Sequence, residues 1–139
     1  LRDQQIKTGG FAELVPLPFV HMESPIYLKG GSRKGPTWRE SVLVHSVARL
    51  ALNPLIPNIQ ASWVKLGPEG VAACLSAGVN DIGGTLMDET ITRSAGAAHG
   101  QEMTPSAMEE LLLREGRPSR QRTTLYQDAA KDRRLASFA

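Results

Sequence analysis

Segments that favour β-structure alternate with segments that favour helices along most of this 139-residue chain. The apolar, β-favouring segments are residues 11–20, 58–64 and 80–86, and a segment with helical periodicity or helix boundary signals follows each of them. Strands and helices that alternate with short turns are typical of a parallel sheet with right-handed crossovers. We therefore expect an α/β fold with about three βα units.

The first predicted helix has a signal at both ends. Thr37 and Glu40 have the spacing of a capping box, and Asn53 with Pro54 ends the helix after residue 52. Between these signals, apolar side chains recur at helical intervals, at Leu43, Val47, Leu50 and Ala51. In the strand before this helix, prolines at positions 16 and 18 remove hydrogen-bond donors, so its end should be irregular.

The other two predicted helices follow the usual placement of proline near the start and glycine beyond the end. Gly67 and Pro68 open a helix that ends near Gly78. Thr104 and Pro105 open a helix that ends near Gly116. A parallel sheet normally needs cover on both faces, whereas three such units supply one layer of helices. We expect residues 1–126 to be the C-terminal portion of a larger TIM-like (βα) barrel, followed by a basic tail at residues 127–139.

Composition excludes few classes of protein, but the single cysteine is informative. Cys74 cannot form an intrachain disulfide or a cysteine-built metal site, so we expect a buried thiol and no metal ligands in this chain. No apolar run approaches the roughly 20 residues that a membrane span needs, and a reducing, cytoplasmic setting fits best. Seven basic residues lie in the last 26 positions without an aromatic stacking pattern, so we expect no nucleic-acid or membrane partner.

Functional side chains of a parallel βα array come from the loops after the carboxyl ends of its strands. This rule collects polar residues after each predicted strand, and we expect them to meet at one rim. His21 and Glu23 are two residues apart and would share a face of an extended segment. Lys65 follows the second strand. The third cluster is Thr85, Met87, Asp88 and Glu89.

Further candidates lie within and beyond the third predicted strand. Asp81 needs a hydrogen-bonding partner in its apolar setting, and Asn80 precedes it. His99 lies among small residues that allow close approach of a ligand or of another segment. His45 is expected to be a packed helix histidine, and Glu69 to stabilise the first turn of its helix. No HExxH, paired CxxC, GxxxxGK[ST] or GxSxG motif occurs, so zinc hydrolysis, P-loop phosphoryl transfer and serine-ester hydrolysis have no anchor.

Three blocks, VPLPFVHMESP, SWVKLGPEG and NDIGGTLMDE, carry a family resemblance together with QRTTLY at residues 121–126. They resemble the C-terminal half of the radical S-adenosylmethionine enzymes that join tyrosine to 5-amino-6-(D-ribitylamino)uracil in the synthesis of FO, the deazaflavin chromophore. The resemblance implies a hydroxybenzyl transfer by the complete enzyme, whose 4Fe-4S cluster is held by a CxxxCxxC motif and binds S-adenosylmethionine. That motif is absent here, so this chain alone should be inactive.

The resemblance implies partners and leaves alternatives open. The implied partners are the N-terminal remainder of the barrel and a ring-closing radical enzyme, which in some proteins is fused to it. It carries over sequence blocks rather than catalytic residues, which stay unknown. The candidates for substrate binding are therefore His21, Glu23, Lys65, Asn80, Asp81, Thr85, Glu89 and His99. Two alternatives are a related futalosine enzyme of menaquinone synthesis and a non-catalytic βα module that binds an anion or a protein.

Overall fold

The computed structural model describes residues 1–86 and 88–138 and has short parallel strands at its centre. Strand β1 (Glu13–Leu14) pairs with β2 (Asn58–Ile59) in parallel. A parallel bridge between Gln60 and Asp81 adds the third segment next to β2. These pairings confirm the expected α/β character and the parallel order of the three segments.

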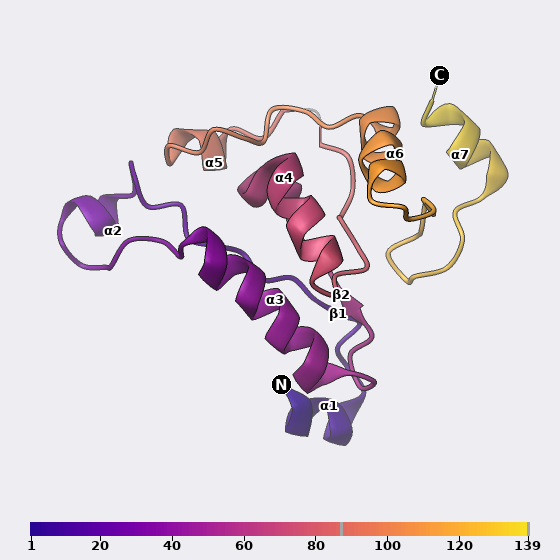
Figure 1. Ribbon diagram of the computed structural model, residues 1–139, viewed down its shortest axis with the longest axis horizontal. Helices are drawn as coiled ribbons and strands as arrows, with labels where there is room; N and C mark the ends of the chain where they lie inside the picture. Colours follow the sequence, from indigo (N-terminus) through magenta and orange to yellow (C-terminus); the bar gives the residue numbers. More distant parts are fainter. Residues whose placement is uncertain (87, 139) are drawn as a thin grey trace.

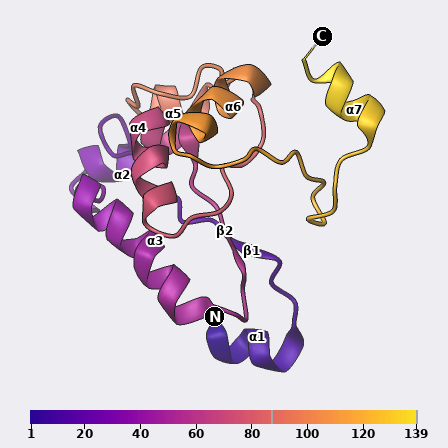
Figure 2. The ribbon, with the colours of Figure 1, turned by 45° about the vertical axis from the view of Figure 1, so that its right-hand side comes forward.

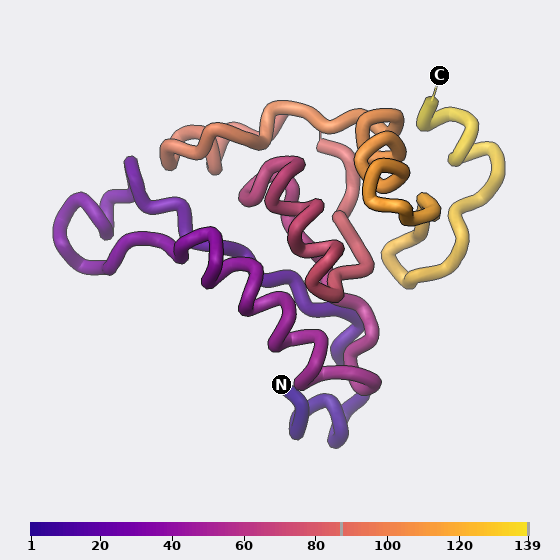
Figure 3. The backbone as a smooth tube through the Cα atoms, viewed as in Figure 1, coloured from indigo at the N-terminus to yellow at the C-terminus, as the bar shows by residue number. Residues whose placement is uncertain are grey.

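The helices surround these strands (Figure 1). In the described residues they are α1 (Arg2–Thr8), α2 (Pro25–Leu28), α3 (Trp38–Leu52), α4 (Trp63–Ser76), α5 (Ile91–Ser94), α6 (Pro105–Arg114) and α7 (Lys131–Ala136). Helix α4 lies between α3 and α6, and α7 stands apart from all three both in this view and in the view turned by 45° (Figures 1 and 2). The backbone from α6 to α7 turns back on itself without helix (Figure 3), and an antiparallel bridge joins Arg122 and Asp128 across this turn.

Local sequence signals set the ends of α3 and α6 as predicted. The Thr37 hydroxyl accepts a hydrogen bond from the Glu40 backbone N–H, and the Glu40 carboxylate accepts one from the Thr37 backbone N–H. This capping box satisfies donors that the first helical turn leaves free. Asn53 caps the other end of α3, and the Thr104 hydroxyl caps α6 by accepting from the Ala107 backbone N–H.

The core lies between the strands and the inner sides of α3 and α4. It contains aliphatic side chains of every central element, with Ile59, Val71 and Cys74 fully enclosed. The expected buried thiol is confirmed, and burial raises the pKa of Cys74 to about 11. His45 is also buried, as expected, and its Nδ1 lies 2.7 Å from the Ser41 carbonyl oxygen.

The strands are shorter than predicted. Residues 11–20 form regular structure only at β1, and the third segment is the single bridge residue Asp81 rather than a strand over residues 80–86. A strand needs a neighbour along its whole length to satisfy its backbone groups, and within the described residues β1 pairs on one edge only. The apolar composition of these segments therefore predicted their position correctly and their length wrongly.

The second predicted strand also ends early, because helix begins within it. The strand prediction covered residues 58–64, but Trp63 and Val64 form the first turn of α4. Gly67 has a left-handed φ of 66° and interrupts the helix, and Pro68 begins its main part. The prediction that Gly67 and Pro68 open a helix is thus confirmed for the main part. Lys65 lies in the helical turn before the break and not at a strand end.

The apolar row that indicated α3 lies on its exposed side. Leu43, Val47 and Leu50 are 54, 52 and 83% exposed, respectively. The buried side consists instead of Ser41, His45, Ala48 and Leu52. Three large apolar side chains thus lie exposed on one face of α3.

Candidate functional site

Residues 88–103, which we call the rim loop, fold back across the segments that follow the strands. The Glu23 backbone N–H donates to the Ala95 carbonyl oxygen at 3.0 Å, and the Glu89 backbone N–H donates to the Gly100 carbonyl oxygen at 3.2 Å. The ring of His99 lies against Gly67, where a β-carbon would come within 2.7 Å of it. The rim loop thereby brings together the segments around residues 21–24, 65–69 and 88–89. Met87, expected in the third cluster, lies outside the described residues.

Lys65 and Glu89 meet at the buried residue Thr92. The Lys65 ammonium donates to the Thr92 hydroxyl at 2.7 Å, and the Glu89 carboxylate accepts from the Thr92 backbone N–H at 2.9 and 3.0 Å. Desolvation raises the pKa of Glu89, but its hydrogen bonds with Thr92 and the charge of Lys65 outweigh this effect and lower the pKa below its ordinary value. Lys65 therefore holds the rim loop against α4, and Glu89 closes a turn within the rim loop.

The predicted pairing of His21 with Glu23 is wrong. Both residues lie at a turn, which the hydrogen bond from the Ser24 backbone N–H to the His21 carbonyl oxygen closes, so they do not share the face of an extended segment. The His21 Nδ1 accepts from the Gly35 backbone N–H at 3.1 Å, and the ring contacts Tyr27 edge-on at 4.8 Å. The Glu23 side chain is exposed. His21 thus has a clear structural role.

The Asn80 side chain makes structural hydrogen bonds to two other parts of the fold. Its Oδ1 accepts from the Arg49 guanidinium at 2.7 Å and from the Ile59 backbone N–H at 2.9 Å. These contacts join α3 to β2. Thr85 is exposed and lies on the wall of a pocket, as described below.

A second polar cluster forms around Asp81. We call residues 117–130 the C-terminal strap, and two of its side chains, Arg122 and Tyr126, reach Asp81 and Glu13. The Tyr126 hydroxyl lies 2.8 Å from Asp81 Oδ2 and also contacts the Glu13 carboxylate. Arg122 pairs with Asp81 and lies 3.5 Å from Glu13 Oε2, and its guanidinium carbon is 4.0 Å from the centre of the Tyr126 ring. We call these four side chains the strap cluster.

The strap cluster is largely shielded from water. The Asp81 side chain is 9% exposed and the Arg122 side chain 24%. Desolvation and the hydrogen bonds to Glu13 and Asp81 raise the pKa of Tyr126, so its hydroxyl stays protonated. For Arg122, desolvation lowers the pKa, but the hydrogen bond and charge of Asp81 outweigh it and raise the pKa. The cluster therefore sets one guanidinium and one phenol hydroxyl against two carboxylates, and Arg122 Nε is buried without a hydrogen-bond partner among the described residues.

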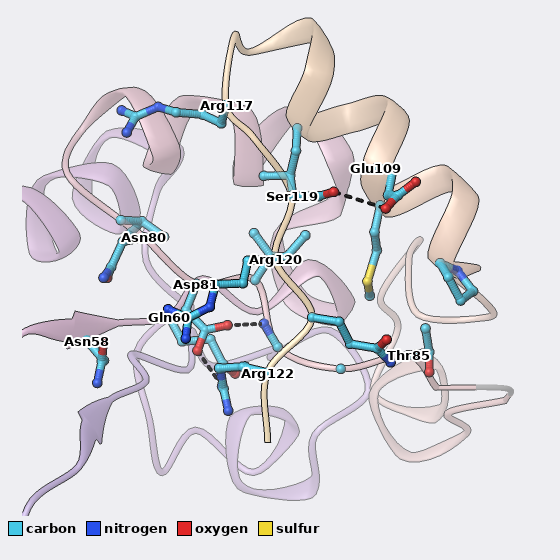
Figure 4. Close-up of a pocket in the computed structure, with 18 of the residues that line it drawn as sticks. Asn58, Gln60, Asn80, Asp81, Thr85, Glu109, Arg117, Ser119, Arg120 and Arg122 are labelled. Atoms are coloured by element: carbon cyan, nitrogen blue, oxygen red, sulfur yellow. Dashed lines mark hydrogen bonds and ion pairs between the residues drawn. The ribbon is translucent and has the colours of Figure 1, made fainter. Parts of the chain in front are cut away.

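The strap cluster forms part of the wall of a pocket of about 790 Å³ (Figure 4). This volume is within the range of small-molecule sites. Gln60 lines the pocket on the side of the strands, and Met108 and Leu112 line it from α6. The strap passes across the pocket, where Ser119 donates to Glu109 at 3.0 Å. Of the residues that the sequence proposed for binding, the pocket contains Asn80, Asp81 and Thr85.

The sequence reasoning missed Glu13, Arg122 and Tyr126 as candidates. Glu13 is a charged residue inside an apolar strand, which is a signal that could have been read in the way that Asp81 was. Arg122 and Tyr126 belong to the QRTTLY block, but their contacts with Asp81 and Glu13 span 41 to 113 positions. No local pattern predicts such a contact.

Two further properties limit the chemistry of the described residues. Among residues 1–86 and 88–138, no three or more His, Cys, Asp or Glu side chains come together in a way that would hold a metal ion. Within the described part of the chain, no helix has the length and apolar character to cross a membrane.

Comparison with known proteins gives a consistent result. Residues 8–134 match the family described as the CofH/MqnC C-terminal region. The chain is 54% identical over 127 residues to the 5-amino-6-(D-ribitylamino)uracil–L-tyrosine 4-hydroxyphenyl transferase of Methanopyrus kandleri. It is 50% identical over 135 residues to the FO synthase of Streptomyces avermitilis, and 52% identical over 126 residues to that of Mycobacterium tuberculosis H37Rv.

These alignments cover most of the chain and a small share of each relative. The alignment with the Methanopyrus protein covers 91% of this chain and 34% of the relative. For the Streptomyces protein the alignment covers 97% of this chain and 16% of the relative, and for the Mycobacterium protein 91% of this chain and 15% of the relative. The family match extends over nearly the whole chain, from the end of α1 into α7. This chain belongs to the CofH/MqnC C-terminal region family.

Proposed function

We propose that this chain is the C-terminal, substrate-binding part of a radical S-adenosylmethionine transferase that moves the hydroxybenzyl group of tyrosine to 5-amino-6-(D-ribitylamino)uracil in FO synthesis. The observation that carries the proposal is the identity of 50 to 54% with proteins of that name or of the name FO synthase, over more than nine-tenths of the chain. A pocket of about 790 Å³ behind the strap supports a role in binding small molecules.

The same proposal places the cofactors elsewhere. A radical S-adenosylmethionine enzyme needs a 4Fe-4S cluster held by three cysteines, and the residues of this chain do not fit that cluster. The chain has one cysteine, which is enclosed in the core and has a raised pKa that disfavours the thiolate. In the proposed enzyme, the cluster and S-adenosylmethionine therefore belong to the N-terminal remainder of a (βα) barrel.

The exposed surface of α3 supports such a remainder. The row of Leu43, Val47 and Leu50 is exposed on α3, and in the described residues β1 has no strand on its second edge. A further strand next to β1, with a helix against the row on α3, would cover both. We propose that the N-terminal part of the barrel supplies this unit. The length of the relatives, roughly three to six times that of this chain, leaves room for it.

In the proposed enzyme, the residues of this chain position substrates and exclude water. The rim loop, held by Lys65 and Thr92, would close one end of the site. The strap cluster would fix part of the pocket wall. Positioning and shielding are what a protein contributes when a cofactor supplies the radical.

Product analysis on the complete enzyme tests the proposal. The enzyme, with its cluster reconstituted, is supplied with S-adenosylmethionine, a reductant, tyrosine and ribitylaminouracil, and the products are identified by mass spectrometry. The expected product is ribitylaminouracil that carries one hydroxybenzyl group. Turnover of a futalosine-type substrate, with tyrosine left intact, would favour the menaquinone-pathway relative and contradict the proposal.

A further inference from the structure

The pocket behind the strap is lined by hydrogen-bond acceptors and by apolar side chains. The acceptors belong to Glu13, Gln60, Asp81 and Thr85, whereas α6 contributes Met108 and Leu112. Figure 4 shows Gln60 on the side of the strands and Thr85 across the strap from it, below α6. A ligand that fits this arrangement has a polar, donor-rich side and a flat or apolar side.

The contacts within the strap cluster leave some hydrogen-bond acceptors of the pocket lining without a partner among the described residues. Both oxygens of Asp81 are engaged, because Oδ1 accepts from the Gly83 backbone N–H and Oδ2 contacts Arg122 and Tyr126. For Glu13, the contacts from Gln60, Arg122 and Tyr126 all reach Oε2. Within residues 1–86 and 88–138, no hydrogen bond reaches Glu13 Oε1 or the Thr85 hydroxyl. Both groups therefore remain for a ligand.

Two of the three arginines that line the pocket are paired with carboxylates. Arg122 pairs with Asp81, Arg120 pairs with Asp128 at 2.6 Å, and Arg117 donates to the Leu75 carbonyl oxygen at 3.3 Å. An amino-acid carboxylate or a phosphate placed beside the free oxygen of Glu13 would be repelled by it. Hydroxyl groups, which donate hydrogen bonds to a carboxylate, would be attracted.

We infer that this pocket binds the ribityl chain of ribitylaminouracil, with hydroxyls donating to Glu13 Oε1 and bonding the Thr85 hydroxyl. Met108 and Leu112 then cover the apolar side of the ligand. Tyrosine, whose carboxylate the Glu13 wall repels, binds outside this pocket. This inference rests on the proposed function and adds to it which substrate contacts which residues.

The test measures binding and steady-state kinetics of the complete enzyme with Thr85→Val and Glu13→Gln. Thr85→Val removes one hydroxyl from an exposed side chain, so folding should be unaffected. We expect the KM and Kd for ribitylaminouracil to rise about 3- to 10-fold in Thr85→Val and about 10-fold or more in Glu13→Gln, because the lost bond of Glu13 involves a charge. The KM for tyrosine should stay unchanged in Thr85→Val.

Two controls separate the ribityl chain from other causes. Thr8→Val makes the same chemical change at the end of α1, outside the pocket, and should leave both KM values unchanged. The analogue 5,6-diaminouracil lacks the ribityl chain, so Thr85→Val should not weaken its binding further, as measured by calorimetry. If Thr85→Val weakens the analogue and the full substrate equally, or raises the KM for tyrosine instead, the inference is overturned.

Failure of the inference differs from failure of the proposed function. If the wild-type enzyme neither binds ribitylaminouracil nor forms the hydroxybenzyl product, both are overturned. If the wild type forms the product while both pocket variants keep the wild-type KM and Kd for ribitylaminouracil, only the ribityl assignment is overturned.

Discussion

Removal of the Arg122 guanidinium should release the C-terminal strap from the sheet. In Arg122→Met, the Asp81 carboxylate, on a side chain only 9% exposed, keeps the Gly83 backbone N–H and the Tyr126 hydroxyl and loses its charged partner. Breaking a fully buried ion pair costs about 3–5 kcal/mol. Because the Arg122 side chain is 24% exposed, solvent screens part of this cost, and we expect about 2 kcal/mol.

Hydrogen exchange of strap amides measures this cost directly. The Thr123 backbone N–H donates to the Gln127 carbonyl oxygen at 2.8 Å, and the Ala129 backbone N–H donates to that of Gln121 at 3.2 Å. A loss of about 2 kcal/mol should speed their exchange roughly 30-fold, since 1.4 kcal/mol corresponds to a factor of ten. The amide of Leu111, in α6, should exchange at an unchanged rate.

Arg120→Met is the matched control for this experiment. Arg120 lies on the same strap and pairs with Asp128, but the two side chains are 63 and 76% exposed. Such a surface pair contributes less than about 1 kcal/mol, so exchange of the same two amides should change less than roughly fivefold. Equal acceleration in the two variants, or none in Arg122→Met, would refute the reasoning that the strap cluster holds the strap.

Three other changes test separate parts of the molecule. Gly67→Ala places a β-carbon at φ 66° within 2.7 Å of the His99 ring, so thermal unfolding should show a loss of stability of at least about 1–2 kcal/mol. A second change, His99→Ala, removes the clash but not the backbone strain, so it should restore only part of this loss. Full restoration would show that the left-handed backbone conformation costs nothing. The pKa of Glu89 is lowered from 4.5, so its contribution to stability is present above pH 4.5 and is lost as the pH falls through the lower pKa of the folded state. An NMR titration of the Thr92 amide should therefore have a midpoint below pH 4.5. A midpoint at or above pH 4.5 would contradict this prediction. The exposed apolar row of α3 should make the isolated chain self-associate, and Leu50→Lys should reduce this association in sedimentation experiments. Unchanged association would show that the row is not the contact.

Features with a local cause could be predicted from the sequence. The capping box of Thr37 and Glu40 depends on groups three residues apart, so its spacing was a sufficient signal. Proline and glycine set the main part of α4 and the start of α6 for the same reason. The parallel order of the strand segments followed from their alternation with helices.

Features that depend on distant partners could not be predicted in this way. The apolar run that ends in Trp63 and Val64 fits a strand or a helix equally well, and here Trp63 lies in a helical turn with its indole N–H donating to the Gly84 carbonyl oxygen, 21 positions away. Asn80 was expected to face a substrate, but Arg49 and Ile59 engage its side chain from two other elements. The strap cluster joins Glu13 to Tyr126 across most of the chain.

Complementation of the two parts of the proposed barrel tests the central claim most directly. This chain and a separately expressed N-terminal part that carries the CxxxCxxC motif are each assayed alone and then together, with S-adenosylmethionine, tyrosine and ribitylaminouracil, for the hydroxybenzyl product. The account predicts no product from either part alone and product from the mixture, in amounts that fall when Leu50→Lys disrupts the exposed row of α3. Product from this chain alone, or a mixture that assembles and binds its cluster yet leaves tyrosine and ribitylaminouracil unreacted, would contradict it.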